Sequence, residues 1–226
     1  MLCKTLLGGL LAATALPCAA QVSWYAGLAG GQSRTDIEAV RNREQTLQLA
    51  QTVQTDFDDR DTAWKVFGGV RLNSVIAVEL TYADLGRAQT VSRGLGGDPA
   101  LPYGTTVNRK VTSYGADIVG FVPLVPTRFE LLGKAGVYRS RLRASSSVEG
   151  NIVFTSDPTA TSRSISRTED TTHLGLGFQW WITRTWGVRA EYERFYSIGK
   201  PFAVGGTGTT GQADVDAAWL AVTARF

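Results

Sequence analysis

Few side chains in this chain of 226 residues have the chemistry of a catalytic or metal-binding group. There is one histidine, His173, and the two cysteines, Cys3 and Cys18, both lie within the first 18 residues. Hydrolysis by a serine requires an adjacent base, but the residue two positions after His173 is Gly175 rather than serine. The sequence therefore predicts no enzyme and no catalytic residue. A lone histidine also argues against a multi-histidine metal centre, and no cofactor is expected.

Phosphate and nucleic-acid binding are not indicated either. The glycine-rich stretch GLGGDP lies within a long polar segment and lacks the strand-to-helix context of a phosphate-binding loop. The formal net charge is only +3, with 23 basic and 20 acidic side chains, which argues against a basic nucleic-acid-binding surface. We therefore expect no nucleic-acid partner.

The first twenty residues have the pattern of a secretory signal peptide. A positive residue near the start is followed by an apolar run over 5–16 and by the small Ala20 before Gln21. An apolar run of roughly 12 residues is too short to cross a bilayer as a helix. We predict a signal peptide at 1–20 that is cleaved before Gln21. The alternative is a lipoprotein signal with Cys18 as the lipidated residue, although the residues before it suit lipidation poorly.

The rest of the chain alternates apolar and polar side chains with period two, which predicts β-strands. In the stretch VIAVELTYADLG, Ile76, Val78, Leu80 and Tyr82 share one face, and smaller or polar residues take the other. Eight strands are predicted on this basis, at about 22–34, 62–71, 75–88, 109–122, 128–143, 171–182, 186–198 and 214–226.

The connections between these strands alternate between short and long. Three of them are turns of a few residues, whereas four are long and polar, at 35–61, 89–108, 144–170 and 199–213. Such alternation places every short turn at one end of the sheet and every long loop at the other, as in outer-membrane barrels. Residues 21–226 are therefore predicted to form an all-β fold, an eight-stranded antiparallel up-and-down transmembrane β-barrel.

Aromatic residues distinguish this prediction from a soluble barrel, whose strands also alternate. They cluster near the predicted strand ends, as in the two aromatic girdles that flank a membrane-spanning apolar band. The sequence thus predicts a protein of the cell outer membrane, in contact with outer-membrane lipid and lipopolysaccharide. The residues assigned to the girdles are Trp24, Trp64, Trp180, Trp186, Phe129 and Phe226, with Tyr82 and Tyr192 on the looped side.

Charged residues alternate onto the opposite, lumen-facing side of the predicted strands. An eight-stranded barrel is barely wide enough for its side chains to fill it, and buried charges require partners. We therefore expect a salt-bridged plug rather than a conducting channel. The basic members are Lys65, Arg71, Arg128, Lys134, Arg189 and Arg225, and the acidic members are Glu79, Asp117, Glu130, Glu191 and Glu193.

Six of these residues are predicted to form the structural ion pairs of the lumen: Lys65, Glu79, Asp117, Lys134, Arg189 and Glu191. A hairpin centred on the turn at 123–127 brings Asp117 opposite Lys134. Glu79 then lies level with Asp117 on the neighbouring strand, and Lys65 lies diagonal to Glu79.

Arg139, Arg141 and Arg143 form a basic row on the opposite, lipid-facing side of one strand. Their guanidinium groups are suited to pair with the phosphates of lipopolysaccharide. The alternative is a strand that extends into solvent with a charged rim.

Several blocks of sequence resemble the OmpA-like family of eight-stranded outer-membrane barrels. They are WYAGLAGG, AWKVFGGVRLNSVIAVELTYADLG, RFELLGKAGVYRSR and the alternation that ends at Phe226. The resemblance implies a barrel-only member without the family's peptidoglycan-binding domain. It also implies that Phe226 acts as an assembly signal, with the barrel-assembly machinery and periplasmic chaperones as partners.

The resemblance implies no single activity. The expected function is a structural or surface-interaction role, adhesin-like, in which the loops bind a host or surface ligand. A narrow ion-conducting pore and a lipid A-modifying enzyme are the alternatives.

Overall fold

The computed structural model describes residues 22–35, 52–96, 101–124, 128–150, 159–198, 202–203, 209–210 and 213–226. These residues contain no helix of the length and apolarity that a membrane-crossing helix requires. The strands are β1 (Ser23–Thr35), β2 (Thr52–Asp58), β3 (Arg60–Arg71), β4 (Ile76–Gly96), β5 (Leu101–Leu124), β6 (Phe129–Gly150), β7 (Ser162–Trp181), β8 (Trp186–Ile198), β9 (Phe202–Ala203), β10 (Thr209–Thr210) and β11 (Ala213–Arg225).

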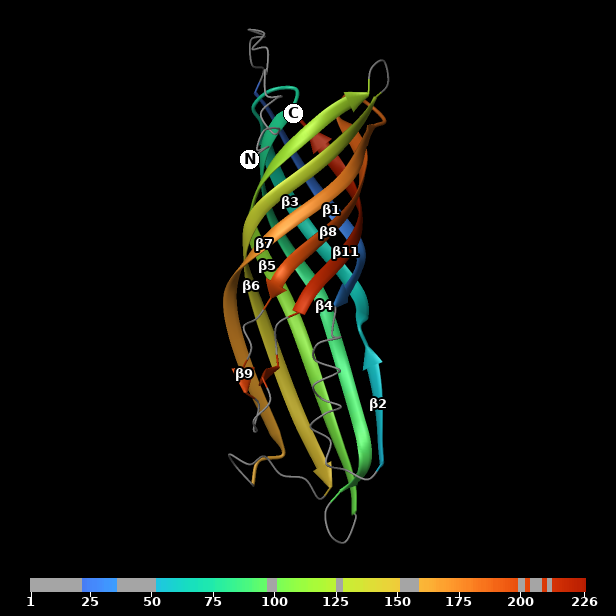
Figure 1. Cartoon of the computed structure of the whole chain (residues 1–226). Helices are drawn as coiled ribbons and strands as arrows, with labels where there is room; N and C mark the ends of the chain where they lie inside the picture. Colours follow the sequence, from blue (N-terminus) through green and yellow to red (C-terminus); the bar gives the residue numbers. More distant parts are fainter. Residues whose placement is uncertain are drawn as a thin grey trace, which may run out of the picture.

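Eight of these strands form a closed antiparallel ring in the order β1, β3, β4, β5, β6, β7, β8 and β11 (Figure 1). The ring closes between the first and last strands, where Tyr25 pairs with Arg225 and Thr35 pairs with Val215. Closure leaves no free sheet edge within the barrel, so the backbone hydrogen bonds are satisfied internally, as a bilayer requires. The predicted up-and-down β-barrel is confirmed.

The strands run considerably further than the sequence predicted. Most of the predicted loop 89–108 is paired strand, because β4 continues to Gly96 and β5 begins at Leu101. The predicted loop 144–170 likewise contains the end of β6 and the start of β7. The predicted loop 35–61 contains β2, which pairs with the outer part of β4, and 199–213 contains the short β9–β10 pair. These segments are rich in Ser, Thr, Gly and Arg and resemble loops, because they lack the apolar face that marks the membrane-spanning strands.

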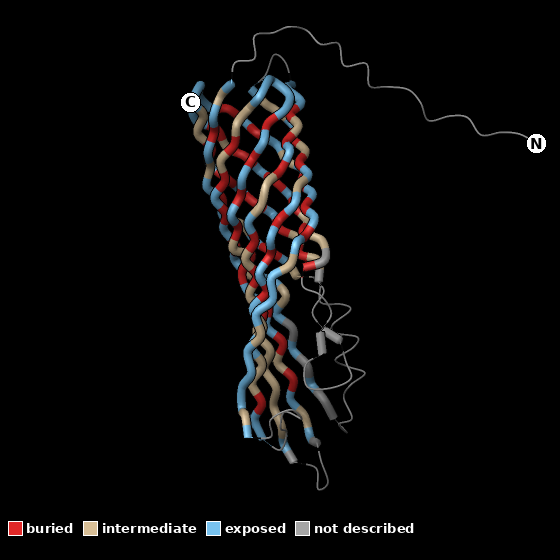
Figure 2. Tube along the Cα trace, turned by 90° about the vertical axis from the view of Figure 1, so that its left-hand side faces the viewer, coloured by how far each residue is buried: buried red, intermediate tan, exposed pale blue. Residues whose placement is uncertain are grey.

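The extra length forms a sheet that projects beyond the closed barrel (Figure 2). Pairing between β7 and β8 stops at Thr172 and Tyr196, whereas pairing between β6 and β7 continues to Ser147 and Ser162. The strands β4 to β7 therefore continue together after their neighbour has ended. We call this projecting sheet the wall, and it comprises residues 87–96, 101–112, 141–150 and 162–170.

Within the barrel, buried and exposed residues alternate along the strands (Figure 2), and many of the exposed ones are large and apolar. Leu80 is 64% exposed and Leu176 is 72% exposed, an arrangement that is unfavourable in water and favourable against lipid. The predicted girdle residues also point outward. Trp186 and Phe226 lie at the short-turn end, and the Trp64 ring lies 5.6 Å from that of Tyr82 nearer the wall. A soluble barrel would have the reverse distribution.

A bulge in β4 marks the junction between barrel and wall. The register between β4 and β5 shifts between Asp84 and Arg87, and Gly86 lies there with a φ of 78°. The Asp84 carboxylate accepts a hydrogen bond from the Gly86 N–H (3.1 Å), and the Asp61 carboxylate accepts one from the Arg87 N–H (2.7 Å). The left-handed conformation favours glycine, so this position fixes where the wall begins.

Candidate functional site

The barrel interior holds a continuous network of three basic and three acidic side chains, all excluded from solvent. Lys65 Nζ lies 2.5 Å from carboxylate oxygens of both Glu191 and Glu193. Lys134 Nζ contacts the same two residues, with 3.0 Å to Glu191 Oε1, and also lies 3.2 Å from Glu79 Oε1. Each lysine therefore neutralises carboxylates contributed by strand β8 from across the lumen.

Arg189 and Glu79 complete this network on the side of the short turns. Arg189 Nη1 donates to Glu79 Oε2 at 2.7 Å and its Nε donates to Gln179 Oε1 at 2.8 Å. The Tyr25 hydroxyl also donates to Glu79 Oε2, at 2.9 Å. We call Lys65, Glu79, Lys134, Arg189, Glu191 and Glu193 the lumen network.

Inward-facing glycines make room for these long side chains. A Cβ at Gly175 would lie 2.9 Å from Lys134 Cγ and 3.2 Å from Glu193 Cγ, closer than ordinary packing allows. This explains why apolar residues alternate with glycine in β7. The apolar residues face lipid on the outside, and the glycines face charged side chains on the inside. Sequence reasoning placed Glu193 on the lumen face but did not include it among the ion-paired residues.

The predicted pair of Asp117 with Lys134 is wrong. Asp117 lies opposite Gly136, and Lys134 lies opposite Val119, because the β5–β6 hairpin is centred one residue later than predicted. A shift of one residue in the centre of a hairpin moves every cross-strand partner by two. The prediction that Glu79 lies level with Asp117 on the neighbouring strand is correct, because the two residues are directly opposite each other.

Asp117 instead binds His173. The Nδ1 atom of His173 lies 2.7 Å from Asp117 Oδ1, and the Tyr138 hydroxyl donates to Asp117 Oδ2 at 2.5 Å. His173 Nε2 lies 3.5 Å from Glu193 Oε2, so the imidazole joins Asp117 to the lumen network. Its ring is fully buried, with the centroids of the Tyr138 and Phe195 rings both 4.5 Å away.

This arrangement differs from a hydrolytic site. Among the described residues no serine or threonine hydroxyl bonds to His173, and the nearby hydroxyls bond to one another. Ser140 Oγ lies 2.7 Å from Ser113 Oγ and 2.9 Å from Thr171 Oγ1. The described part of the chain also has no cluster of three His, Cys, Asp or Glu residues suited to a metal ion.

Two predicted interior cations lie elsewhere, near the short turns. Arg128 is exposed, and its Nη1 donates to the carbonyl of Ile182 at 2.7 Å. Arg225 Nε donates to the Arg184 carbonyl at 2.5 Å, while its guanidinium lies 4.3 Å from the centre of the Trp181 ring. Both are at strand ends, where the lumen opens and alternation no longer determines burial.

Arg71 and Glu130 form a separate ion pair at 2.9 Å near the same end of the barrel. The Trp181 indole N–H donates to Glu130 at 3.1 Å. This pair lies between the lumen network and the short-turn mouth of the barrel.

Arg139, Arg141 and Arg143 are exposed on the outer face of β6, as their alternation predicted. Arg139 Nε lies 3.3 Å from Asp170 Oδ1 on the neighbouring strand. Their contact with lipopolysaccharide stays a prediction.

Phe226 combines a backbone role with an exposed ring. Its N–H donates to the Trp24 carbonyl at 3.0 Å, and its carbonyl accepts from the Trp24 N–H at 3.1 Å, which extends the closing pair of strands. The side chain is 75% exposed and faces lipid. The closing hydrogen bonds therefore do not involve the ring, whose role as an assembly signal stays a prediction.

We expect Phe226→Ala to lower the yield of assembled barrel in cells while leaving export across the inner membrane unchanged. Because the backbone bonds to Trp24 survive, the barrel refolded in detergent should lose less than about 1 kcal/mol of unfolding free energy. Heat-dependent gel migration of outer-membrane fractions measures the yield, and Phe226→Tyr is the matched control. Unchanged yield for the alanine variant would contradict the signal role.

Comparison with solved structures identifies proteins of similar architecture. The crystal structure of Ail, the attachment invasion locus protein of Yersinia pestis, in complex with the heparin analogue sucrose octasulfate is 16% identical, with a TM-score of 0.48 over 91% of this chain and 99% of that one. Neisserial surface protein A is 12% identical, with a TM-score of 0.48 over 91% and 97%. OprG of Pseudomonas aeruginosa is 14% identical, with a TM-score of 0.46 over 91% and 95%.

A search of curated protein sequences finds no significant match. A family model, in contrast, covers almost the whole chain. The model of the outer membrane protein β-barrel domain matches residues 5–226, so this chain belongs to that family and is a protein of the outer membrane.

Proposed function

We propose that this protein has a surface-interaction, adhesin-like role in which the closed barrel anchors the wall at the cell surface. The observation that carries this proposal is the wall itself. Four strands continue as a paired sheet after β8 has ended, on the side of the long connections. In outer-membrane barrels the long connections lie outside the cell. A rigid paired sheet presents side chains in a fixed arrangement, which suits recognition better than flexible loops do.

The charge of the wall indicates the class of ligand. Its described residues include eight basic side chains and three acidic ones, and β2, which pairs along its edge, adds Asp56 and Asp58. Such an excess favours acidic partners such as sulfated or carboxylated glycans, and it raises their rate of encounter. A passive structural barrel would not need this projection.

The filled lumen argues against the pore alternative. The side chains of Lys65, Lys134 and Glu79 are completely buried and each is ion-paired within the lumen network, so an ion would have to displace them to pass. The environment of His173, buried between two carboxylates, likewise gives no support to a lipid A-modifying enzyme.

A variant without the wall tests the proposal. Asp84 lies opposite Thr112, and Ser140 lies opposite Glu169, so each hairpin can be closed at those pairs by an Asn-Gly turn, which removes all eight basic side chains of the wall. We expect the full chain, reconstituted in liposomes, to bind immobilised heparin, and we expect the shortened chain to bind at least about tenfold more weakly. Heat-dependent gel migration confirms that both barrels are folded.

Planar-bilayer recording of the same two proteins provides the comparison with a pore. We expect no stepwise conductance from either barrel. Equal glycan binding by the two proteins would overturn the role of the wall, and no binding by either would overturn the acidic-ligand assignment. Regular conductance steps from the full chain would make the pore the better function.

A further inference from the structure

On the outer face of the barrel–wall junction, basic residues from three adjacent strands lie side by side. Arg87 in β4 is directly opposite Lys110 in β5, and Lys110 is directly opposite Arg143 in β6. Like charges on directly opposite residues are destabilising, because their Cβ atoms are only about 5 Å apart. Asp84 contributes one carboxylate to this row, with its Oδ2 atom 2.8 Å from Lys110 Nζ.

The row therefore carries more positive charge than its neighbours neutralise. Arg141 adds a further cation on the same face, opposite Thr112. In the part of the chain that the structure describes, the exposed side chains of Arg87, Arg141 and Arg143 make no ion pair. We call Arg87, Lys110, Arg141 and Arg143 the cationic belt. An anion bound from outside would remove the repulsion within it.

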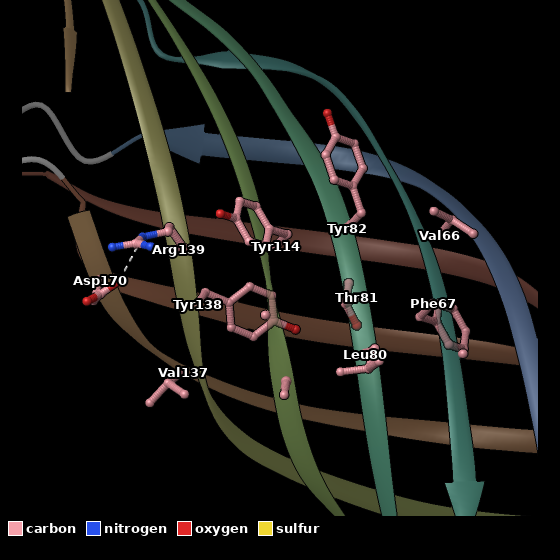
Figure 3. Close-up of a pocket in the computed structure, with 13 residues that line it drawn as sticks. Val66, Phe67, Leu80, Thr81, Tyr82, Tyr114, Val137, Tyr138, Arg139 and Asp170 are labelled. Carbon is pink, nitrogen blue, oxygen red and sulfur yellow. Dashed lines mark ion pairs between the residues drawn. The ribbon is translucent and has the colours of Figure 1, made fainter. Parts of the chain in front are cut away.

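Next to the belt, on the side of the barrel, the outer face carries a shallow apolar depression (Figure 3). Ala116 lies between Leu80 and Val137 on the neighbouring strands, and its small side chain leaves the hollow between these larger ones. Tyr82 and Tyr114 border the hollow on the side of the wall (Figure 3). Arg139, paired with Asp170, stands at its corner (Figure 3).

The order of these features matches the layers of a lipid monolayer. The Tyr82 ring lies 5.6 Å from the Trp64 ring in the aromatic girdle, which marks the headgroup level of outer-membrane barrels. The depression lies on the apolar side of this girdle, at the depth of acyl chains, and the cationic belt lies on its polar side. Phosphates and acyl chains of one lipid are separated in the same order.

We propose that this face of β4 to β6 is a specific binding site for the phosphorylated, multiply acylated glycolipid of the outer leaflet, the lipid A part of lipopolysaccharide. The belt binds the phosphates, because guanidinium groups bond phosphate oxygens in a bidentate manner. One acyl chain occupies the hollow over Ala116, and Arg139 lies where headgroup and chain meet. The belt shares its four basic residues with the wall, whereas Ala116 and the hollow over it lie within the barrel.

The phosphate half of the site is tested by Arg87→Gln combined with Arg143→Gln. Native mass spectrometry of the barrel in detergent with added bisphosphorylated lipid A measures the bound fraction. We expect the double variant to bind at least about tenfold more weakly than the parent. Arg184→Gln, an exposed arginine at the short-turn end, is the matched control and should bind as the parent does.

The acyl half is tested by Ala116→Leu, which fills the hollow without a change of charge. We expect a loss of about fivefold in lipid A binding. Ala135→Leu makes the same change on the outer face of β6 away from the hollow, and should have no effect. Thermal unfolding in detergent verifies that both barrels are intact.

Two comparison ligands complete the experiment: lipid A without its phosphates, and phosphatidylglycerol. Both should bind the parent at least tenfold more weakly than bisphosphorylated lipid A. Equal binding of phosphatidylglycerol, or equal losses for Ala116→Leu and Ala135→Leu, would mean a non-specific basic surface and would overturn the site. Heparin binding by Ala116→Leu is measured in parallel. This variant keeps every basic side chain of the wall and should bind heparin as the parent does, so failure of this site is distinguishable from failure of the wall's proposed function.

Discussion

Replacing Lys134 with methionine is expected to destabilise the barrel by about 3–5 kcal/mol, because the change leaves buried carboxylates without their shared cation. Lys134 contacts Glu79, Glu191 and Glu193, and all four side chains are excluded from solvent. Lys65 and Arg189 remain near these carboxylates but cannot neutralise three of them completely. The free energy of unfolding is obtained from urea titration of the barrel refolded in lipid vesicles.

Three further variants make this result specific. Lys110→Met removes a partly exposed lysine paired with Asp84 on the outer face, and should change the free energy of unfolding by less than about 1 kcal/mol. Adding Glu193→Gln to Lys134→Met removes one uncompensated charge and should recover part of the loss. Adding Asp117→Asn should recover none, because Asp117 binds His173 and Tyr138 instead. If Asp117→Asn recovered stability in the Lys134→Met background and Glu193→Gln did not, the observed register would be contradicted.

Gly136→Ala is expected to lower the free energy of unfolding by about 3 kcal/mol, the upper part of the range for overpacked sites. A Cβ at this inward position would lie 2.1 Å from the Ala116 carbonyl oxygen and 2.3 Å from Asp117 Oδ1. No side chain tolerates a backbone oxygen at that distance, so β5 and β6 would have to separate locally. Displacement of Asp117 would also disturb its bond to His173.

The same substitution three residues earlier in β6 is the control. A Cβ at Gly133 meets its nearest atom, Leu176 Cδ2, at 3.6 Å, which is ordinary van der Waals contact. Gly133→Ala should therefore change the free energy of unfolding by less than about 0.5 kcal/mol. Urea titration of both variants measures the difference. A loss at Gly136 as small as that expected at Gly133 would mean that the inward face of β6 is less tightly packed than the structure indicates.

The sequence by itself determined the membrane-spanning part of this protein. Alternation with period two assigns each side chain to one of two faces, and lipid on one face requires a continuous apolar series such as Ile76, Val78 and Leu80. The same parity identified the inward charges Lys65, Lys134 and Arg189. These properties are local to a strand, so no knowledge of its neighbours is needed to predict them.

Only the tertiary structure decided which charges meet and how far the strands extend. Parity places Lys134 and Asp117 on the same face, but their separation depends on the centre of one hairpin, and contacts such as Lys65 with Glu193 cross the lumen. The wall escaped prediction because its strands carry mostly polar side chains and lack a continuous apolar face, although inward positions such as Thr90, Ser92 and Leu142 are buried. The row of Arg87, Lys110 and Arg143 likewise depends on the register of three strands and on the bulge at Gly86, which no single strand encodes.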